Sequence, residues 1–309
     1  MDLSDLLKKR VVFVSGKGGC GKTSISVFLA LIAEQLEKRV LIIEMDSTDR
    51  VAPLFERKKT DHQITEFTPY ISAINLSPKL CFEDYAVSII FFHTLYKAFL
   101  DNSYVNNFIN AAPGLKEFLM LRKIIEFEDE GKHGFFFKEP TYDLIIVDAP
   151  STGHGLSVLE VPKVLADVTK IGPLYTQAKR ISKCLADKEK TAFCVVTLAE
   201  EMPVIESEEY VTALKEGTDL NFGPMFINSL MPGVEDIQVE ELMPSELVGF
   251  LDYHNLSKER HELNQTYLKE IEVRFPEFTK INIDFQFQGL RSHKDFWPLL
   301  NFHLESLSD

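Results

Sequence analysis

A glycine-rich segment near the start of the chain constrains the fold more than any other part of the sequence. Residues 16–23 read Gly-Lys-Gly-Gly-Cys-Gly-Lys-Thr and match the phosphate-binding loop pattern G-x-x-x-x-G-K-[ST] without a mismatch. The apolar run 11–14 before them is typical of a buried strand, and the apolar stretch 24–33 after them is typical of a helix packed on a sheet. In such a unit, the backbone N–H groups of the loop and the positive end of the helix dipole point toward the same site, which favours an anion. The segment is therefore predicted to bind the phosphates of a nucleotide.

Each residue type in this segment has an expected task. Lys22 would lie along the β- and γ-phosphates, and the Thr23 hydroxyl would ligate Mg²⁺. Asp148 ends the apolar strand 144–147 and would hold the same ion, partly through water; the alternative is a carboxylate that only forms a turn. The predicted nucleotide-binding residues of the loop are Gly16, Lys17, Gly18, Gly19, Cys20, Gly21, Lys22, Thr23 and Ser24.

Composition limits the classes of protein that remain. The chain has 309 residues, 45% of them hydrophobic, which allows one large α/β domain or two small ones. Its formal net charge of -14 argues against a broad nucleic-acid footprint and against docking on anionic lipid. The four cysteines are scattered, as in a reducing cytoplasm, and no run reaches the roughly 18 to 20 apolar residues of a spanning helix. We therefore expect a cytoplasmic protein that does not insert into a membrane.

Strand-like and helix-like segments alternate along the chain. This pattern predicts an α/β fold with a doubly wound, mostly parallel sheet, formed by a single domain over residues 1–309. Helical patterns dominate from residue 77 to about 135, which we interpret as a helical subdomain inserted between two strands. Predicted strands cover residues 11–14, 40–44, 70–76, 142–148, 191–197 and 223–228, with a weaker one at 283–287. Short helices are expected at 3–10 and 295–307.

A second lysine in the loop narrows the class of nucleotide-binding protein. Lys17 directly follows the first glycine, and in this respect the chain resembles the deviant Walker A ATPases, a group of P-loop NTPases with the SIMIBI-type fold. In that group the extra lysine crosses a dimer interface to the phosphates of the partner. The resemblance therefore implies a catalytic role for Lys17 and a nucleotide-sandwich dimer. The alternative is a solvated loop lysine.

Two later motifs resemble the arsenite-pump and tail-anchored-protein-targeting ATPases, the ArsA type. Residues 148–154, Asp-Ala-Pro-Ser-Thr-Gly-His, resemble their switch II, and residues 47–49, Ser-Thr-Asp, resemble their switch I. The resemblance implies that Asp49 positions or activates the attacking water, with Asp46 as the local alternative. A carboxylate at this place could otherwise cap the next helix. Thr152 and Gly153 are expected to form a flexible turn whose N–H groups meet the γ-phosphate.

The resemblance covers about residues 10 to 290, with departures in both switches. The family usually continues switch I as Asp-Pro-Ala-His, whereas residues 49–52 here read Asp-Arg-Val-Ala. The family's switch II usually reads Asp-Thr-Ala-Pro-Thr-Gly-His, whereas residues 148–154 here read Asp-Ala-Pro-Ser-Thr-Gly-His, which is a milder difference. Asn228 corresponds to the family's adenine-recognising asparagine, since a side-chain amide can both donate and accept. The alternative for Asn228 is a turn at the end of a strand.

Together these features predict a Mg²⁺-dependent ATPase that forms a homodimer, or a heterodimer with a related ATPase, and binds ATP and ADP. Its hydrolysis would be coupled to a membrane-protein partner or to a hydrophobic or protein cargo, with client contacts in the apolar segment 89–100 unless that segment is core. Cys81 and Cys184 lack the spacing of a metalloid site, and no C-x-x-C motif is present. Two alternatives remain: a weakly or non-hydrolysing subunit of a heteromer, and an ATP-dependent small-molecule synthetase.

Overall fold

The computed structural model describes residues 1–45, 48–60, 62–89, 114–129, 141–234 and 246–308. Its strands are β1 (Val11–Gly16), β2 (Val40–Glu44), β3 (Thr65–Glu66), β4 (Ile71–Asn75), β5 (Leu144–Asp148), β6 (Thr191–Leu198), β7 (Phe222–Leu230) and β8 (Lys280–Asp284). They form one eight-stranded sheet in the order β3-β4-β2-β5-β1-β6-β7-β8. Every pairing is parallel except that of the two-residue β3 with β4. The predicted α/β fold with a mostly parallel sheet is confirmed.

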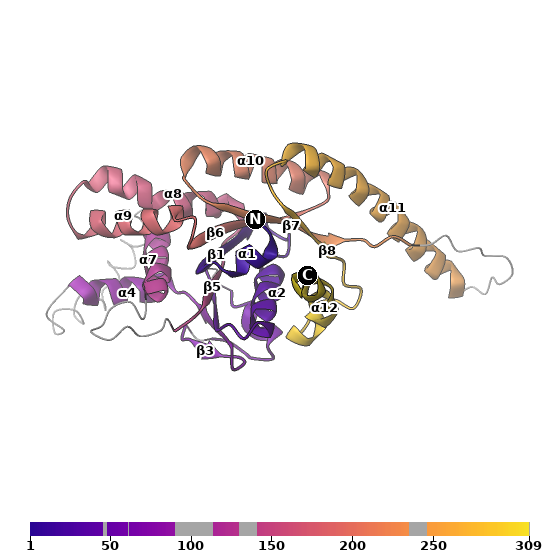
Figure 1. Ribbon diagram of the computed structural model, residues 1–309, viewed down its shortest axis with the longest axis horizontal. Coiled ribbons are helices and arrows are strands. Elements are labelled where there is room, and N and C mark those ends of the chain that lie inside the picture. Colours follow the sequence, from indigo (N-terminus) through magenta and orange to yellow (C-terminus); the bar gives the residue numbers. More distant parts are fainter. Residues whose placement is uncertain (46–47, 61, 90–113, 130–140, 235–245, 309) are drawn as a thin grey trace.

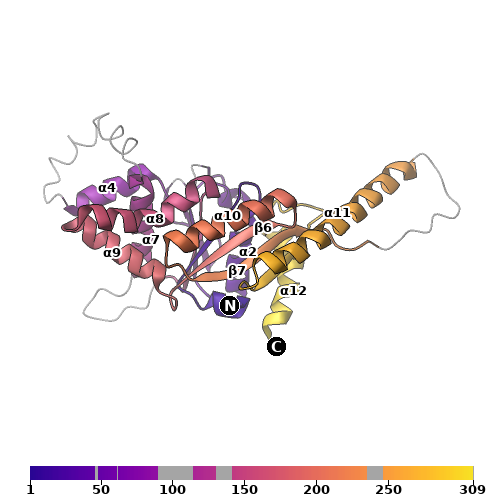
Figure 2. The same ribbon diagram turned by 90° about the horizontal axis from the view of Figure 1, so that it is seen from above.

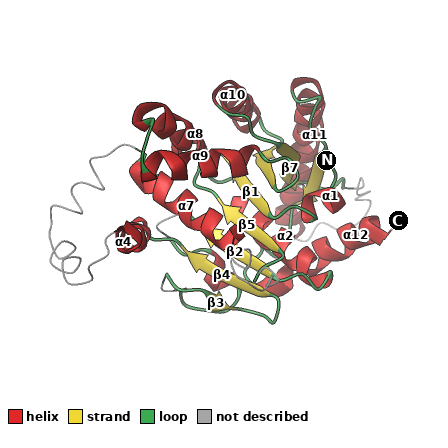
Figure 3. Ribbon diagram, turned by 60° about the vertical axis from the view of Figure 1, so that its left-hand side comes forward, coloured by secondary structure: helices red, strands yellow, loops and turns green. Residues whose placement is uncertain are grey.

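Helices cover both faces of this sheet (Figures 1 and 3). On one face lie α4 (Pro78–Ile89), α7 (Leu115–Asp129), α8 (Thr152–Thr169), α9 (Pro173–Ala186), α10 (Glu201–Gly217) and α11 (Glu246–Arg274). On the other face lie α1 (Leu3–Leu7), α2 (Lys22–Gln35), α3 (Val51–Leu54), the 3-10 helix η1 (His293–Phe296) and α12 (Trp297–Ser308). The amino-terminal half of α11 extends away from the body of the molecule (Figure 2). Within the described residues, no helix combines the length and apolar character needed to span a membrane.

The alternation of side chains along each strand explains the two-layer core. Val11 and Phe13 point into the core cluster under α7 to α11, whereas Val12 and Val14 point into the cluster under α2 and α12. All four are at most 1% exposed, as expected for a parallel strand covered on both faces. The carboxyl end of β1 lies centrally in the sheet, where open α/β folds bind ligands.

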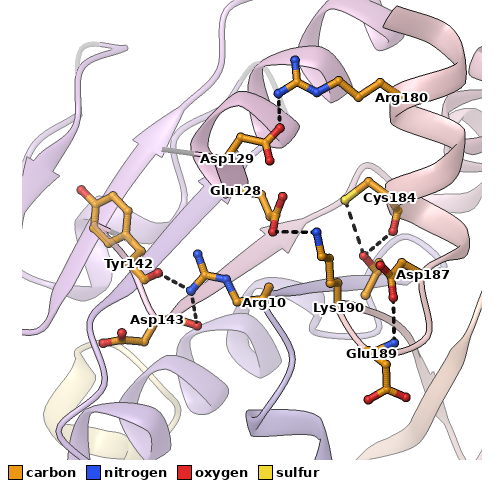
Figure 4. A network of polar contacts seen from close by, with 11 residues as sticks. Arg10, Glu128, Asp129, Tyr142, Asp143, Arg180, Cys184, Asp187, Glu189 and Lys190 are labelled. Carbon is orange, nitrogen blue, oxygen red and sulfur yellow. Dashed lines mark hydrogen bonds and ion pairs between the residues drawn. The ribbon is translucent and has the colours of Figure 1, made fainter. Parts of the chain in front are cut away.

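The two ends of the strands carry different polar groups. At the amino ends, Arg10 donates to the backbone oxygens of Tyr142 and Asp143, and Lys190 pairs with the buried Glu128 at 3.6 Å (Figure 4). This network joins the starts of β1, β5 and β6 to the end of α7. The phosphate-binding loop lies at the opposite, carboxyl ends of the strands.

Most predicted elements are present, and some differ in extent. The last strand lies at 280–284 instead of 283–287, because the buried residues there are Ile281 and Ile283. The helical region predicted between β4 and β5 contains α4 and α7, and α7 places residues such as Phe118 and Leu121 in the main core. Of the apolar segment 89–100, which was predicted to contact clients, residues 90–100 lie outside the described residues.

Candidate active site

The phosphate-binding loop connects the end of β1 to the start of α2, as predicted. Its last residue before the helix, Gly21, has φ 89° and lies so close to β7 that a Cβ there would meet the Asn228 amide nitrogen at 2.2 Å. Only glycine fits both conditions. The Lys22 ammonium donates to the Lys17 carbonyl at 3.1 Å, so it lies along the inside of its own loop. Ser24 follows in the first turn of α2. The loop thus has the arrangement that its sequence predicts for phosphate binding.

Thr23 and Asp148 lie in direct contact beneath the loop. The Thr23 hydroxyl donates to Asp148 Oδ2 at 2.6 Å, and the Ser26 hydroxyl lies 3.4 Å from Asp148 Oδ1. Burial raises the pKa of Asp148 to about 6, against the opposing effects of Thr23, Lys22 and Ser26. A hydroxyl and a carboxylate are the oxygen donors that Mg²⁺ prefers, and Mg²⁺ bound to a nucleotide needs few protein ligands. The donors therefore fit the predicted cation site.

A second buried carboxylate, Glu44, lies beside this site and was not among the predicted site residues. It ends β2, and its neighbour across the sheet is Asp148. Its Oε1 accepts from the backbone N–H groups of Arg50 and Val51 at 2.7 and 3.1 Å. Glu44 is 1% exposed, and burial raises its pKa to about 8. A sequence signal existed: a glutamate ends the apolar run 40–43 just as Asp148 ends 144–147.

The structure predicts that removing the charge of Glu44 changes the pH dependence of stability. Because its folded pKa of about 8 lies above the ordinary value of 4.5, its stabilising contribution is complete below pH 4.5 and is lost as pH rises through 8. The unfolding free energy of Glu44→Gln should therefore rise relative to that of wild type by about 3–4 kcal/mol between pH 5 and pH 8. Urea unfolding in EDTA at several pH values measures this. A constant difference across that range would contradict the assignment.

Asp49 is held by its own loop. Its Oδ1 accepts from the N–H of Ala52, so it caps α3, and its Oδ2 accepts from the N–H and hydroxyl of Thr60 at 2.6 and 3.0 Å. The helix-capping alternative is thus present in the structure, while the role of Asp49 toward water stays a prediction. The local alternative, Asp46, and the adjacent Ser47 lie outside the described residues.

The Lys17 side chain reaches from the loop to helix α10, whereas its backbone carbonyl accepts from the Lys22 ammonium. Its Nζ forms an ion pair with Glu206 of α10 at 2.7 Å, and the two side chains are 43% and 23% exposed. An ion pair this exposed contributes about 0–1 kcal/mol, so Lys17 can exchange this partner for another at little cost. Glu206 was not predicted as a site residue, because no local sequence pattern links it to the loop.

Asn228 contacts the phosphate-binding loop. It lies in β7, and its amide nitrogen donates to the Cys20 carbonyl at 2.9 Å. This hydrogen bond joins the loop to a strand 208 residues away in the sequence. It uses one amide N–H and leaves the side-chain oxygen available, so the predicted recognition of adenine by Asn228 stays a prediction.

Switch II differs from the expected flexible turn. Residue 152 is the first of the 18-residue helix α8, and Ser151 before it has an extended backbone. A Cβ added to Gly18 would lie 3.9 Å from the Ser151 Cβ, so the start of α8 lies against the phosphate-binding loop. A helix N-terminus presents unpaired N–H groups to an anion, as the predicted turn would have done. The side chains of residues 152–157, His154 included, lie outside the described residues.

The cysteines are buried thiols. Cys20 is 1% exposed and faces the core beneath the loop. Cys81 and Cys184 belong to the other core cluster, and burial raises their pKa values to about 12 and about 11. These values disfavour the thiolate that binds soft metals. Across the described part of the chain, no group of three or more His, Cys, Asp or Glu side chains is placed to hold a metal ion by itself.

Comparison with known proteins agrees with this geometry. The sequence profile of the anion-transporting ATPase family matches residues 9–173 and 167–296. ATPase BagA of Mycobacterium tuberculosis is 30% identical over 228 residues, which cover 72% of this chain and 66% of that protein. An Aquifex aeolicus protein provisionally named arsenical pump-driving ATPase 2 is 24% identical, with 94% of this chain and 99% of that protein covered. ATPase GET3 of Kluyveromyces lactis is 21% identical, with 100% and 95% covered.

The family match extends over most of the chain and includes every element that builds the loop. It covers β1, α2 and β5 in its first part and β6, α10 and β7 in its second. The contact of Thr23 with Asp148 under the loop is compatible with phosphoryl-transfer chemistry. The chain belongs to the anion-transporting ATPase family, of the ArsA type.

Proposed function

We propose that the protein is a Mg²⁺-dependent ATPase that works as a dimeric switch and couples hydrolysis to a partner or cargo. The observation that carries the proposal is the contact between Thr23 and Asp148 under the phosphate-binding loop. Mg²⁺ held by this pair would neutralise charge on the β- and γ-phosphates. Lys22 and the loop N–H groups would bind the same phosphates, and Asp49 would orient the attacking water. The residues 1–309 would act as one ATPase domain with a helical insertion at about 77–135.

The position of Lys17 supports the dimer. In this subunit the Lys17 ammonium pairs with Glu206 and the side chain is 43% exposed, whereas the Lys22 ammonium donates to a carbonyl of the loop itself. We propose that this exposed lysine exchanges Glu206 for the phosphates of a second subunit, either another copy of this chain or a related ATPase. The fungal relative is named ATPase GET3 and the Aquifex relative is named for an arsenical pump. We therefore propose a protein or hydrophobic cargo, or a membrane-protein partner, and a cytoplasmic location without nucleic-acid binding.

Replacing Lys17 with alanine tests the dimer. Wild type should show dimer mass with ATP or with ADP and a γ-phosphate mimic, and monomer mass without nucleotide, because only a bound γ-phosphate offers Lys17 a partner across the interface. The Lys17→Ala variant should remain monomeric and hydrolyse ATP at least about tenfold more slowly. Analytical ultracentrifugation and a phosphate-release assay measure both effects.

A matched control is Lys8→Ala. Lys8 is also an exposed lysine in an ion pair, with Asp5 at 2.9 Å, but it directly follows α1. This variant should dimerise and hydrolyse like wild type. If Lys17→Ala does so as well, the proposed role of Lys17 is wrong. Intact nucleotide binding without turnover, in wild type and in Asp49→Asn, would instead favour a non-hydrolysing subunit.

A further inference from the structure

Three buried polar side chains form a row at the carboxyl edge of the sheet. Asn75, Glu44 and Asp148 end the neighbouring strands β4, β2 and β5, and they are paired in register. Each follows strand residues that point toward α2, so all three lie on the face of the sheet that α2 covers. They are 3%, 1% and 7% exposed. Polar groups this buried need a partner, because leaving them unpaired costs stability.

The two carboxylates of this row are neighbours across the sheet. Strands in a sheet lie about 4.8 Å apart, so Glu44 and Asp148 hold two acidic groups at adjacent positions. Within the described part of the chain, Lys22 is the cation that acts on Asp148 most directly, and it belongs to the phosphate site. Two carboxylates buried side by side do not readily ionise together unless a positive charge joins them. The pair therefore offers more acceptor oxygens than the Thr23 hydroxyl, a single hydrogen-bond donor, can occupy.

Only one of the two carboxylate oxygens of Glu44 accepts hydrogen bonds from the described residues. Oε1 accepts the N–H groups of Arg50 and Val51, which follow directly on the switch I residues 47–49. Oε2 is buried and has no hydrogen-bond partner among the described residues. A side chain that only anchored this loop would need one acceptor oxygen, which an amide or a hydroxyl also supplies. The second buried oxygen indicates an additional ligand.

We propose that Glu44 is the second carboxylate of the cation site: Oε2 faces the bound Mg²⁺ together with Asp148, through water, while Oε1 holds the backbone that follows switch I. The inference rests on the proposed use of Mg²⁺ and adds a residue to that site. It makes Glu44 a positioning residue, since it links occupancy of the cation site to the position of the segment 48–60. Asp49 and Thr60 lie in that segment and share a hydrogen bond.

The test uses substitutions that separate charge from shape. Glu44→Gln keeps an acceptor for Arg50 and Val51 and removes the charge, whereas Glu44→Asp keeps the charge on a shorter side chain. Titration of Mn²⁺ into the protein–ADP complex, followed by electron paramagnetic resonance, gives the cation affinity without any hydrolysis. Glu44→Gln should bind Mn²⁺ about tenfold more weakly, as expected for a ligand acting through water, and Glu44→Asp should recover part of the loss. The affinity for ADP in EDTA should stay unchanged.

Hydrogen exchange provides a second measurement. In wild type, adding Mg²⁺ to the ADP complex should slow amide exchange at residues 50 and 51, and Glu44→Gln should lose this dependence on the cation. The control is Glu128→Gln, which alters an equally buried carboxylate, 1% exposed, at the opposite end of the strands, where it faces Lys190 (Figure 4). The control should retain the wild-type cation affinity.

The outcomes distinguish this inference from the proposed function. Cation affinity and cation-dependent protection equal to wild type in Glu44→Gln would overturn the role of Glu44 while leaving the Mg²⁺-dependent ATPase intact. A wild-type complex that binds ADP but shows no cation binding at all would overturn the proposed use of Mg²⁺ itself. Equal losses in Glu44→Gln and Glu128→Gln would show a general effect of buried carboxylates on stability, and would also contradict the inference.

Discussion

Replacing Asp148 with asparagine is expected to lower the rate of ATP hydrolysis by roughly a hundredfold or more. The carboxylate accepts a hydrogen bond from the Thr23 hydroxyl at 2.6 Å and is 7% exposed. Asparagine preserves the shape and one acceptor oxygen but removes the charge that would hold Mg²⁺. Phosphoryl transfer depends on neutralising phosphate charge, so kcat should fall more than KM rises. Steady-state kinetics over a range of Mg²⁺ concentrations measures both constants.

The same strand offers a matched control. Asp143 precedes the other end of β5, where it pairs with Arg39 at 3.2 Å on the surface. Asp143→Asn makes the same chemical change just before the opposite end of β5. It should alter kcat by less than about twofold, because an exposed ion pair contributes little to the fold and nothing to phosphate binding. Turnover of Asp148→Asn within tenfold of wild type would remove Asp148 from the cation site.

Replacing Gly16 with alanine should destabilise the protein by about 3–5 kcal/mol. Gly16 has φ 152°, and a Cβ there would lie 2.2 Å from the carbonyl oxygen of Val196, its partner in the neighbouring strand. The carbonyl belongs to the backbone of β6, so the clash cannot be relieved by turning a side chain. The two central strands would have to separate at the point where the phosphate-binding loop begins. Urea unfolding without nucleotide measures the loss.

Gly19→Ala separates backbone strain from the clash. Gly19 also has a positive φ, 87°, but a Cβ there would meet nothing within 4 Å. The Gly19→Ala substitution should lower the unfolding free energy by about 1–2 kcal/mol, which is the strain of the left-handed conformation alone. A loss for Gly16→Ala no greater than that for Gly19→Ala would show that β1 and β6 separate easily, contrary to the packing described above.

The fold and the centre of the site were predictable because both follow from local sequence. Parallel strands buried on both faces are continuous apolar runs, as at 40–43 and 144–147, so β2 and β5 could be placed within two residues. The loop pattern fixes its own geometry through glycines and a helix start. Asp148 could be paired with Thr23 because strand ends of a parallel sheet meet at one edge.

The remaining site residues depend on contacts that the sequence does not encode locally. Glu206 reaches Lys17 from a helix about 190 positions away, and Asn228 reaches Cys20 across 208 positions. Glu44 was visible as the end of a strand, but its partners depend on how the chain turns back through residues 50 and 51. The start of α8 was predicted as a turn, because the glycines at 153 and 155 oppose a helix locally and tertiary packing overrides that preference.

The outer strands of the sheet bear on how the molecule avoids aggregation. An open strand edge exposes unpaired backbone groups that can recruit the edge of another molecule. Here one outer strand is the two-residue β3, and the other, β8, directs the polar side chains of Asn282 and Asp284 to solvent. Neither edge offers a long apolar ribbon, so extension of the sheet from one molecule to the next is disfavoured. A concentrated solution of this protein should therefore resist fibrillar association, and any ordered self-association should use the loops at the carboxyl ends of the strands.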